Sequence, residues 1–282
     1  MKRNILSLFI VFSISLFTIS CSKDDTDKQN VNETANLELV TILINNNHKV
    51  EIYNSNGQLN NGYNEIFVRI KDNAGTYINN ASLEWNPVMH MMSMSHSCPY
   101  SAITRVLGTQ TLYSGYIIFQ MAGNESEYWE LTINYTIGGK NFSVQGRINV
   151  SQSEKRTLNV FTGTDGVKYI LAMIEPAVPK VAVNTMTAVL YKMESMSAFT
   201  VADNFRIKID PRMPGMNNHT SPNNKALTQS NTGGVYKGAL SLTMTGYWKI
   251  NLQLEDAQGN LLKGEPVTET NESSSIWFEI EF

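Results

Sequence analysis

Cysteine is scarce in this sequence. Only two of its 282 residues are cysteine, and the first, Cys21, closes an N-terminal apolar segment. Cys98 is therefore the one cysteine left in the rest of the chain, and it has no second thiol with which to form an intramolecular disulfide framework. We expect the fold to be held together by packing.

Basic charge is also in short supply. The chain has 22 Lys and Arg against 25 Asp and Glu. Lys2 and Arg3 lie in the N-terminal segment that we expect to be removed, which leaves 20 basic against 25 acidic residues. Such a balance offers no obvious basic face for phosphate backbones, so no nucleic-acid partner is expected.

The familiar enzyme motifs are absent. The sequence contains no Gly-x-Ser-x-Gly elbow, no His-Glu-x-x-His and no phosphate-binding Gly-x-x-x-x-Gly-Lys. Glu125 and Glu127 suit a solvated loop better than a glycosidase pair, and residues 163–166 suit a turn. The sequence therefore predicts a protein that is not an enzyme.

The N-terminus is typical of an exported lipoprotein. Two basic residues precede an apolar run over 5–19, and Ser20 leads into Cys21. The run is shorter than the roughly 20 residues that a membrane-spanning helix needs, so residues 1–20 are predicted to be a secretory signal peptide. Residues 18–21 resemble a bacterial lipoprotein signal, in which the cysteine becomes the acylated N-terminus. Cleavage without lipidation is the alternative.

The polar segment 21–36 is predicted to be a lipidated, flexible tether. Residues 22–25, Ser-Lys-Asp-Asp, resemble the signal that directs some Gram-negative lipoproteins to the outer face of the outer membrane. A plain solvated tether of the same composition is the alternative. We therefore expect a lipid-anchored protein of the outer membrane, exposed on the cell surface, with the periplasmic leaflet as the other location.

Alternation of apolar and polar residues with period two dominates the rest of the chain. Residues 129–135 and 248–255 are clear cases, and this alternation is typical of half-buried antiparallel strands. Turn signals rich in Gly, Asn and Ser separate such segments, and no stretch sustains an amphipathic helix. The sequence predicts an all-β protein made of immunoglobulin-like β-sandwich modules, each with about seven short strands.

One set of landmarks occurs twice at nearly equal spacing. The first copy comprises Pro87, Met89, Met92, His96, Tyr113, Gly115, Met121, Gly123, Tyr128 and Trp129. The second comprises Pro211, Met213, Met216, His219, Tyr236, Gly238, Met244, Gly246, Tyr247 and Trp248. The shared order indicates a tandem duplication, with modules at 37–150 and 166–282 and a linker at 151–165. We expect each Pro-Met segment to be a loop or bulged edge, because proline cannot sit in a central strand.

Soft metal donors are concentrated in these Pro-Met segments. Four methionines and two histidines lie within residues 89–96, and Met213, Met216 and His219 form a smaller set in the second half. Thioether sulfur suits Cu(I), and imidazole accepts copper in either oxidation state, so the pattern favours copper. Two alternatives stay open: zinc bound by the histidines and Cys98 without a paired framework, and methionines that simply fill the open end of each sandwich.

The landmarks resemble the YtkA-like domain, a relative of the FixH group. The resemblance covers residues 85–135 and 209–255. Family members are small exported or membrane-anchored β-sandwich domains, linked by analogy and context to copper handling and respiratory-oxidase assembly. The resemblance implies copper as the cofactor and the following metal ligands: Met89, Met92, His96 and Met121 in the first module, and Met213, Met216, His219 and Met244 in the second.

His90 stands where the second copy has Pro214, and Cys98 stands where it has Ser221, so the resemblance gives neither of them a role. Cys98 could be a copper ligand, a nucleophile paired with His96, or a small buried apolar residue, which is the commonest fate of a free cysteine. The sequence favours a copper-binding envelope lipoprotein that captures Cu(I) or hands it to a copper-delivery or other envelope protein. The alternative is a surface interaction or structural module that binds protein or glycan without metal.

Overall fold

The structure, a computed structural model, describes residues 32–282. The predicted signal peptide, the lipidation of Cys21 and most of the predicted tether lie outside the described residues. Residues 33–282 form one compact unit. Its regular structure is almost entirely β-strand, and the one helical element in this part of the chain is a 3-10 turn at Pro214–Met216. The prediction of an all-β fold is confirmed.

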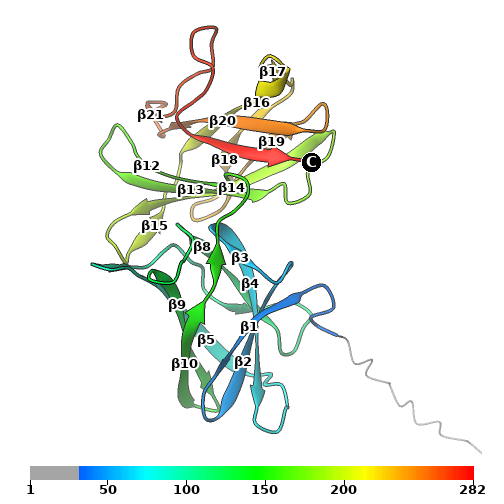
Figure 1. The fold of residues 1–282 in the computed structure, drawn as a ribbon, viewed down its shortest axis with the longest axis vertical. Coiled ribbons are helices and arrows are strands. Elements are labelled where there is room, and N and C mark those ends of the chain that lie inside the picture. Colours follow the sequence, from blue (N-terminus) through cyan, green and yellow to red (C-terminus); the bar gives the residue numbers. More distant parts are fainter. Residues whose placement is uncertain (1–31) are drawn as a thin grey trace, which may run out of the picture. The chain divides into compact units, whose positions relative to one another are not determined.

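Two antiparallel sheets form a β-sandwich in the first half of this unit (Figure 1). One sheet has the order β1 (Glu38–Ile44), β2 (His48–Asn54), β4 (Gly62–Asp72), β8 (Tyr113–Phe119) and β7 (Thr104–Arg105). The other has the order β10 (Lys140–Ile148), β9 (Tyr128–Ile137), β5 (Ala81–His90) and β6 (Ser95–His96). A short parallel pair, β3 (Leu59–Asn60) with β11 (Val150–Ser151), lies outside both sheets.

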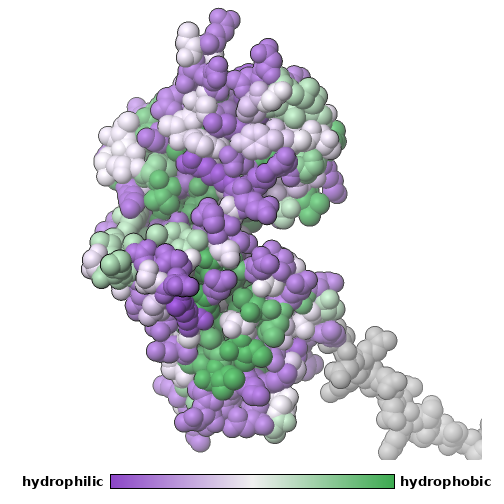
Figure 2. Space-filling view, in the orientation of Figure 1, coloured by the Kyte–Doolittle hydropathy of each residue, from purple (hydrophilic) through white to green (hydrophobic). Residues whose placement is uncertain are grey.

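Strand β1 is an edge strand that exposes apolar side chains. It pairs with β2 alone in its sheet, and Leu39, Ile42 and Ile44 are exposed. Figure 2 shows hydrophobic residues gathered over the region of β1 and β2. Leu43, by contrast, points into the core, as the period of two in a strand requires.

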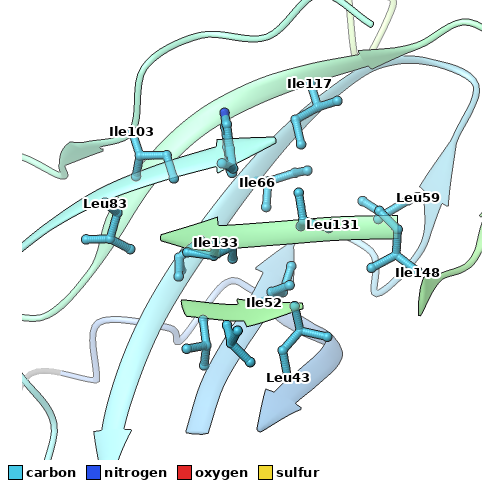
Figure 3. Close-up of a cluster of buried hydrophobic side chains, with 14 of the residues drawn as sticks. Leu43, Ile52, Leu59, Ile66, Leu83, Ile103, Ile117, Leu131, Ile133 and Ile148 are labelled. Atoms are coloured by element: carbon cyan, nitrogen blue, oxygen red, sulfur yellow. The ribbon is translucent and has the colours of Figure 1, made fainter. Parts of the chain in front are cut away.

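The core of the first sandwich is built from the inward positions of both sheets. Figure 3 shows Ile66, Ile117 and Leu131 converging from β4, β8 and β9. In β5 the burial alternates strictly from Leu83 to Met89, because one face of the strand meets the opposite sheet and the other meets solvent. β9 shows the same alternation of burial over residues 129–135, where the sequence predicts a strand.

The second half has the same strand order. One layer runs β12 (Leu158–Thr162), β13 (Lys168–Glu175), β14 (Val183–Met193), β19 (Tyr236–Ser241) and β18 (Lys225–Gln229), with β15 (Phe199–Val201) beside β14. The other contains β17 (His219–Thr220), β16 (Arg206–Met213), β20 (Tyr247–Glu255), β21 (Leu261–Lys263) and β22 (Trp277–Glu281). A pair between Ile207 and Leu227 joins the two layers.

The expected linker at 151–165 contains regular structure. β12 lies within it and pairs with β13 over residues 158–162, and Leu158 and Phe161 are buried. A boundary at 166 would therefore divide the β12–β13 hairpin. A further cluster of buried residues combines Ile118 of β8 with residues of β12, β13 and β14. The division of the unit into two modules with the stated limits stays a prediction.

Pro87 and Pro211 lie within strands. Pro87 belongs to β5, paired with β9, and Pro211 belongs to β16, paired with β20. The expectation of a loop or bulge at these prolines is wrong. Their carbonyls accept hydrogen bonds from the hydroxyls of Ser97 and Thr220, so they point away from the long neighbouring strand. In an extended strand the nitrogen of a residue points to the same side as its carbonyl. The nitrogens of Pro87 and Pro211 therefore also point away from the long neighbouring strand, and neither proline removes a hydrogen bond of that ladder.

Candidate functional site

A tight hairpin brings Met89 and His96 together. β5 pairs Met89 with His96 of β6 on one side and with Trp129 of β9 on the other. Residues directly opposite one another in antiparallel strands project their side chains from the same face, with Cβ atoms about 5 Å apart. All three residues are buried, and the rings of His96 and Trp129 meet edge to face with centroids 5.5 Å apart. We call these three residues the first His-Met-Trp row.

The second half contains an equivalent row. β16 pairs Met213 with His219 of β17, and its register with β20, which pairs Arg212 with Lys249, places Met213 next to Trp248. The ring centroids of His219 and Trp248 are 6.5 Å apart. These residues, His219, Met213 and Trp248, form the second His-Met-Trp row.

Met121 and Met244 lie at the tryptophan end of the rows. The indole N–H of Trp129 donates to the carbonyl oxygen of Met121 at 2.9 Å, and that of Trp248 donates to Met244 at 3.0 Å. Both methionine side chains are half-buried against their cores. The same bond in both halves fixes the indole ring of each tryptophan, and because a backbone carbonyl accepts it, it places no requirement on the methionine side chain.

Met92 and Met216 face solvent. Met92, at the tip of the β5–β6 turn, is 88% exposed, and Met216, at the end of the 3-10 turn, is 50% exposed. Met89 and Met213 are buried. The structure therefore pairs two of the four predicted ligands of each half, Met89 with His96 and Met213 with His219. It places only the backbone carbonyl of a third against the tryptophan of the row, and it leaves the fourth exposed to solvent.

The ring of His96 is held in one tautomer. Its Nδ1 lies 2.8 Å from the carbonyl oxygen of Ser97, and because a carbonyl can only accept, Nδ1 must carry the proton. In the neutral ring Nε2 then has a free lone pair. Ser97 is itself fixed, since its amide N–H donates to Met196 and its hydroxyl donates to Pro87, both at 2.8 Å. An imidazole held in this way is typical of metal-binding histidines.

Met91 and Met94, two further methionines of the β5–β6 hairpin, are not among the ligands that the resemblance implies. The amide of Met91 donates to the carbonyl oxygen of Met94 at 2.9 Å, so these residues close the turn around residues 92–93. Met91 packs against the core, and Met94 is partly exposed. Strict alternation from Met89 predicts Met91 on the same face of the strand, whereas the family pattern implies Met92 as the ligand.

Cys98 is fully buried in the first core. Burial raises the pKa of its thiol well above the ordinary value, because the anionic form would lose its solvation. The side chain is therefore a small apolar group of the core at neutral pH. Among the three roles considered for Cys98, the structure favours packing.

His90 lies on the opposite face of β5 from Met89. Its ring stacks on Tyr128 with centroids 5.1 Å apart, and its Nε2 lies 3.5 Å from a carboxylate oxygen of Glu130. This nitrogen is buried and has no hydrogen-bond partner. His90 is consequently not part of the first His-Met-Trp row.

A polar cluster on the outward face of β2 and β4 is internally satisfied. Glu51 accepts hydrogen bonds from Tyr53 at 2.7 Å, Lys71 at 2.8 Å and Tyr77 at 3.1 Å. Burial opposes ionisation of Glu51, but these hydrogen bonds outweigh it and hold the pKa of the carboxyl below its ordinary value. Because Tyr53, Lys71 and Tyr77 all donate to Glu51, the cluster stabilises the fold. Across residues 32–282, no three His, Cys, Asp or Glu side chains come together in a metal-binding arrangement.

Comparisons with known proteins give similarity of structure only. No family model matches the chain, and no curated protein matches it. Among solved structures it is similar to FdeC, an Escherichia coli adhesin, with 14% identity and a TM-score of 0.27 over 85% of this chain and 65% of that chain. It is also similar to a conserved domain protein from Bacillus anthracis, with 11% identity and a TM-score of 0.31 over 89% of this chain and 93% of that chain.

In the described part of the chain, no helix has the length and apolar character needed to cross a membrane.

Proposed function

We propose that this chain is a non-enzymatic lipoprotein of the cell envelope that binds Cu(I) at its His-Met-Trp rows and captures the ion or hands it to an envelope partner. The proposal includes acylation at Cys21, which would hold the protein in the outer membrane, and kinship with the YtkA-like domain. Copper would be the bound cofactor, and a copper-delivery or other envelope protein would be the partner.

The observation that carries the proposal is the direct pairing of a methionine with a histidine in both halves. Met89 faces His96, and Met213 faces His219, across two neighbouring strands. A thioether and an imidazole at this separation are soft and borderline donors of the kind that Cu(I) prefers. The free lone pair on Nε2 of His96 adds a donor that is already oriented.

Anaerobic titration with Cu(I) against a chromogenic chelator tests the proposal. We expect the purified protein to take Cu(I) from the chelator, and a variant combining Met89→Leu, His96→Gln, Met213→Leu and His219→Gln to lose this ability. Met173→Leu is the matched control, because Met173 is half-buried against the second core but lies outside both rows. Wild-type protein that leaves the chelator fully loaded would remove the copper function.

The exposed edge of β1 favours a second candidate function, that of a surface module binding protein or glycan. Ile44 is 63% exposed and Ile42 is 39% exposed, and both lie on β1. An open edge strand with apolar side chains can add a strand from a partner. This surface does not involve either His-Met-Trp row.

Binding to protein and glycan arrays separates the two functions. If metal-free and Cu(I)-loaded protein bind the same array ligand equally, and an Ile42→Lys, Ile44→Lys variant loses that ligand, then the interaction function is supported. A ligand bound only by the Cu(I)-loaded form supports copper hand-over instead. Elemental analysis of protein purified from its native envelope gives an independent measure of copper.

A further inference from the structure

We propose that the principal metal site is the inward face of the β5–β6 hairpin, formed by Met89, Met91, Met94 and His96, and that Met92 takes no part. The inference rests on the proposed function and goes beyond it. It replaces one of the expected ligands with two other methionines, and it predicts that the two halves bind the ion with unequal affinity.

Register selects the members of this face. Met89 pairs with His96, and His90 pairs with Ser95. The hydrogen bond from Met91 to Met94 continues the same register by one more pair. Because paired residues share a face and successive pairs alternate between faces, the Met91–Met94 pair lies on the face of Met89 and His96.

Burial agrees with this assignment. Met89 and His96 are buried, and Met91 packs against the core beside them. His90, from the intervening pair, lies on the other face against Tyr128. Three thioethers and one imidazole therefore project from a single face of a two-stranded ribbon.

The donor set selects a soft monovalent ion. Thioether ligands favour Cu(I) and its analogue Ag(I), whereas Mg²⁺ and Ca²⁺ require oxygen ligands. The carboxylate of Glu130 lies with His90, which projects from the opposite face. Imidazole supplies the remaining donor through Nε2, since Nδ1 of His96 is engaged by Ser97.

Exposure decreases from the turn toward the sheet. Met94 is 51% exposed, Met91 is half-buried, and Met89 is completely buried. An ion arriving from solvent would meet Met94 first, and the deeper donors would then complete its coordination. The gradient gives the site an entrance at the turn.

The second half has no equivalent of the Met91–Met94 pair. After Met213 the chain enters the 3-10 turn, and Asn217 and Asn218 adopt left-handed conformations. None of the residues 214–218 other than the exposed Met216 carries a soft donor. His219 is exposed, and within residues 32–282 no hydrogen bond orients its ring. The second site therefore has fewer and less constrained donors than the first.

Methionine methyl NMR of the purified protein, labelled with 13C at the methionine methyl groups and titrated with Ag(I), tests this assignment. Signals are assigned with single Met→Leu variants, which roughly preserve side-chain volume. We expect the first equivalent of Ag(I) to shift the methyl signals of Met89, Met91 and Met94, to leave that of Met92 unchanged, and to precede any shift at Met213.

Competition for Cu(I) then measures how much Met91 and Met94 contribute to the affinity for the ion. The Met91→Leu, Met94→Leu variant should bind Cu(I) about a hundredfold more weakly, since even the loss of a supporting contact costs roughly 10–100-fold in metal affinity. Met92→Leu, from the same turn, is the matched control and should bind like the wild type. Thermal unfolding of both variants verifies that they are folded.

The outcomes separate this inference from the copper function. Wild-type protein that binds neither ion overturns both. Wild-type protein that binds, with Met92→Leu weakened and the Met91→Leu, Met94→Leu variant unaffected, overturns the inference and keeps the function. Binding that depends on Met213 and His219 alone also overturns the inference and keeps the copper function.

Discussion

Replacing Gly238 with alanine should destabilise the second β-sandwich. Gly238 lies on β19, opposite Met186 of β14. A Cβ atom at this position would lie 2.5 Å from the carbonyl oxygen of Lys225 and 2.9 Å from that of Ala226. Both oxygens belong to the backbone of β18, whose pairing with β19 is irregular between Lys225 and Thr228. They cannot move aside as the end of a flexible side chain would, and such a close backbone approach is a recurring reason for glycine in a strand.

The size of the effect follows from the kind of atom that is in the way. Overpacking of a well-packed site costs about 1–3 kcal/mol, and because backbone atoms cause the clash here, we expect about 2–3 kcal/mol. For a unit of this size each 1 kcal/mol lowers the melting temperature by about 2–4 °C. Gly238→Ala should therefore lower it by about 4–12 °C.

Urea unfolding followed by tryptophan fluorescence measures the change, and Gly215→Ala is the matched control. Gly215 belongs to the 3-10 turn, and a Cβ atom there would meet no atom within 4 Å. Its substitution should change the free energy of unfolding by less than about 0.5 kcal/mol. If Gly238→Ala proves as stable as Gly215→Ala, the close-approach explanation for the Tyr-x-Gly landmark is refuted.

Three further predictions concern titratable groups. Cys98 should resist a thiol reagent in the native protein at pH 8 and react fully in urea, because its thiol is buried with a raised pKa; rapid native labelling would contradict this. The pKa of Glu51 is lowered on folding, so it stabilises the fold above its unfolded pKa, and that stability is lost as the pH falls through the folded value; Glu51→Gln should flatten the acid limb of a plot of unfolding free energy against pH. Burial lowers the pKa of His48 below 6.5, and the smaller effect of Asp72 opposes this shift. Because the unfolded chain then binds the proton more readily than the folded one, the free energy of unfolding should also begin to decrease as the pH falls through 6.5. An NMR titration of the His48 ring should show the lowered pKa.

Most of the strands could be predicted from the sequence because their burial is one-sided. Apolar and polar residues alternate in the sequence from Trp129 to Tyr135, burial alternates in the same way, and β9 spans Tyr128–Ile137. For β12 the sequence predicts a polar linker instead, because the strand is short and its buried residues Leu158 and Asn159 are adjacent rather than alternating. Tertiary pairing with β13, which a local pattern does not contain, decides this segment.

The prolines show a second limit of local reasoning. Pro87 has no amide hydrogen, and a proline in a central strand normally costs a ladder bond. Whether that cost arises depends on which side of the strand the missing hydrogen would have faced. In β5 that side is turned toward the hydroxyl of Ser97, and only the paired structure reveals it.

The composition of the candidate site depends on a single residue of spacing. Met89 and His96 are seven positions apart, whereas Met213 and His219 are six apart. With seven, the register can continue inward through His90–Ser95 and Met91–Met94 to a turn of two residues. With six, the same inward pairing would end on one residue, which cannot form such a turn, and the chain instead passes through the 3-10 turn with two left-handed asparagines. The sequence therefore contains the difference between an odd and an even spacing. The odd spacing gives a hairpin face with four donors, Met89, Met91, Met94 and His96, and the even spacing gives one with two, Met213 and His219.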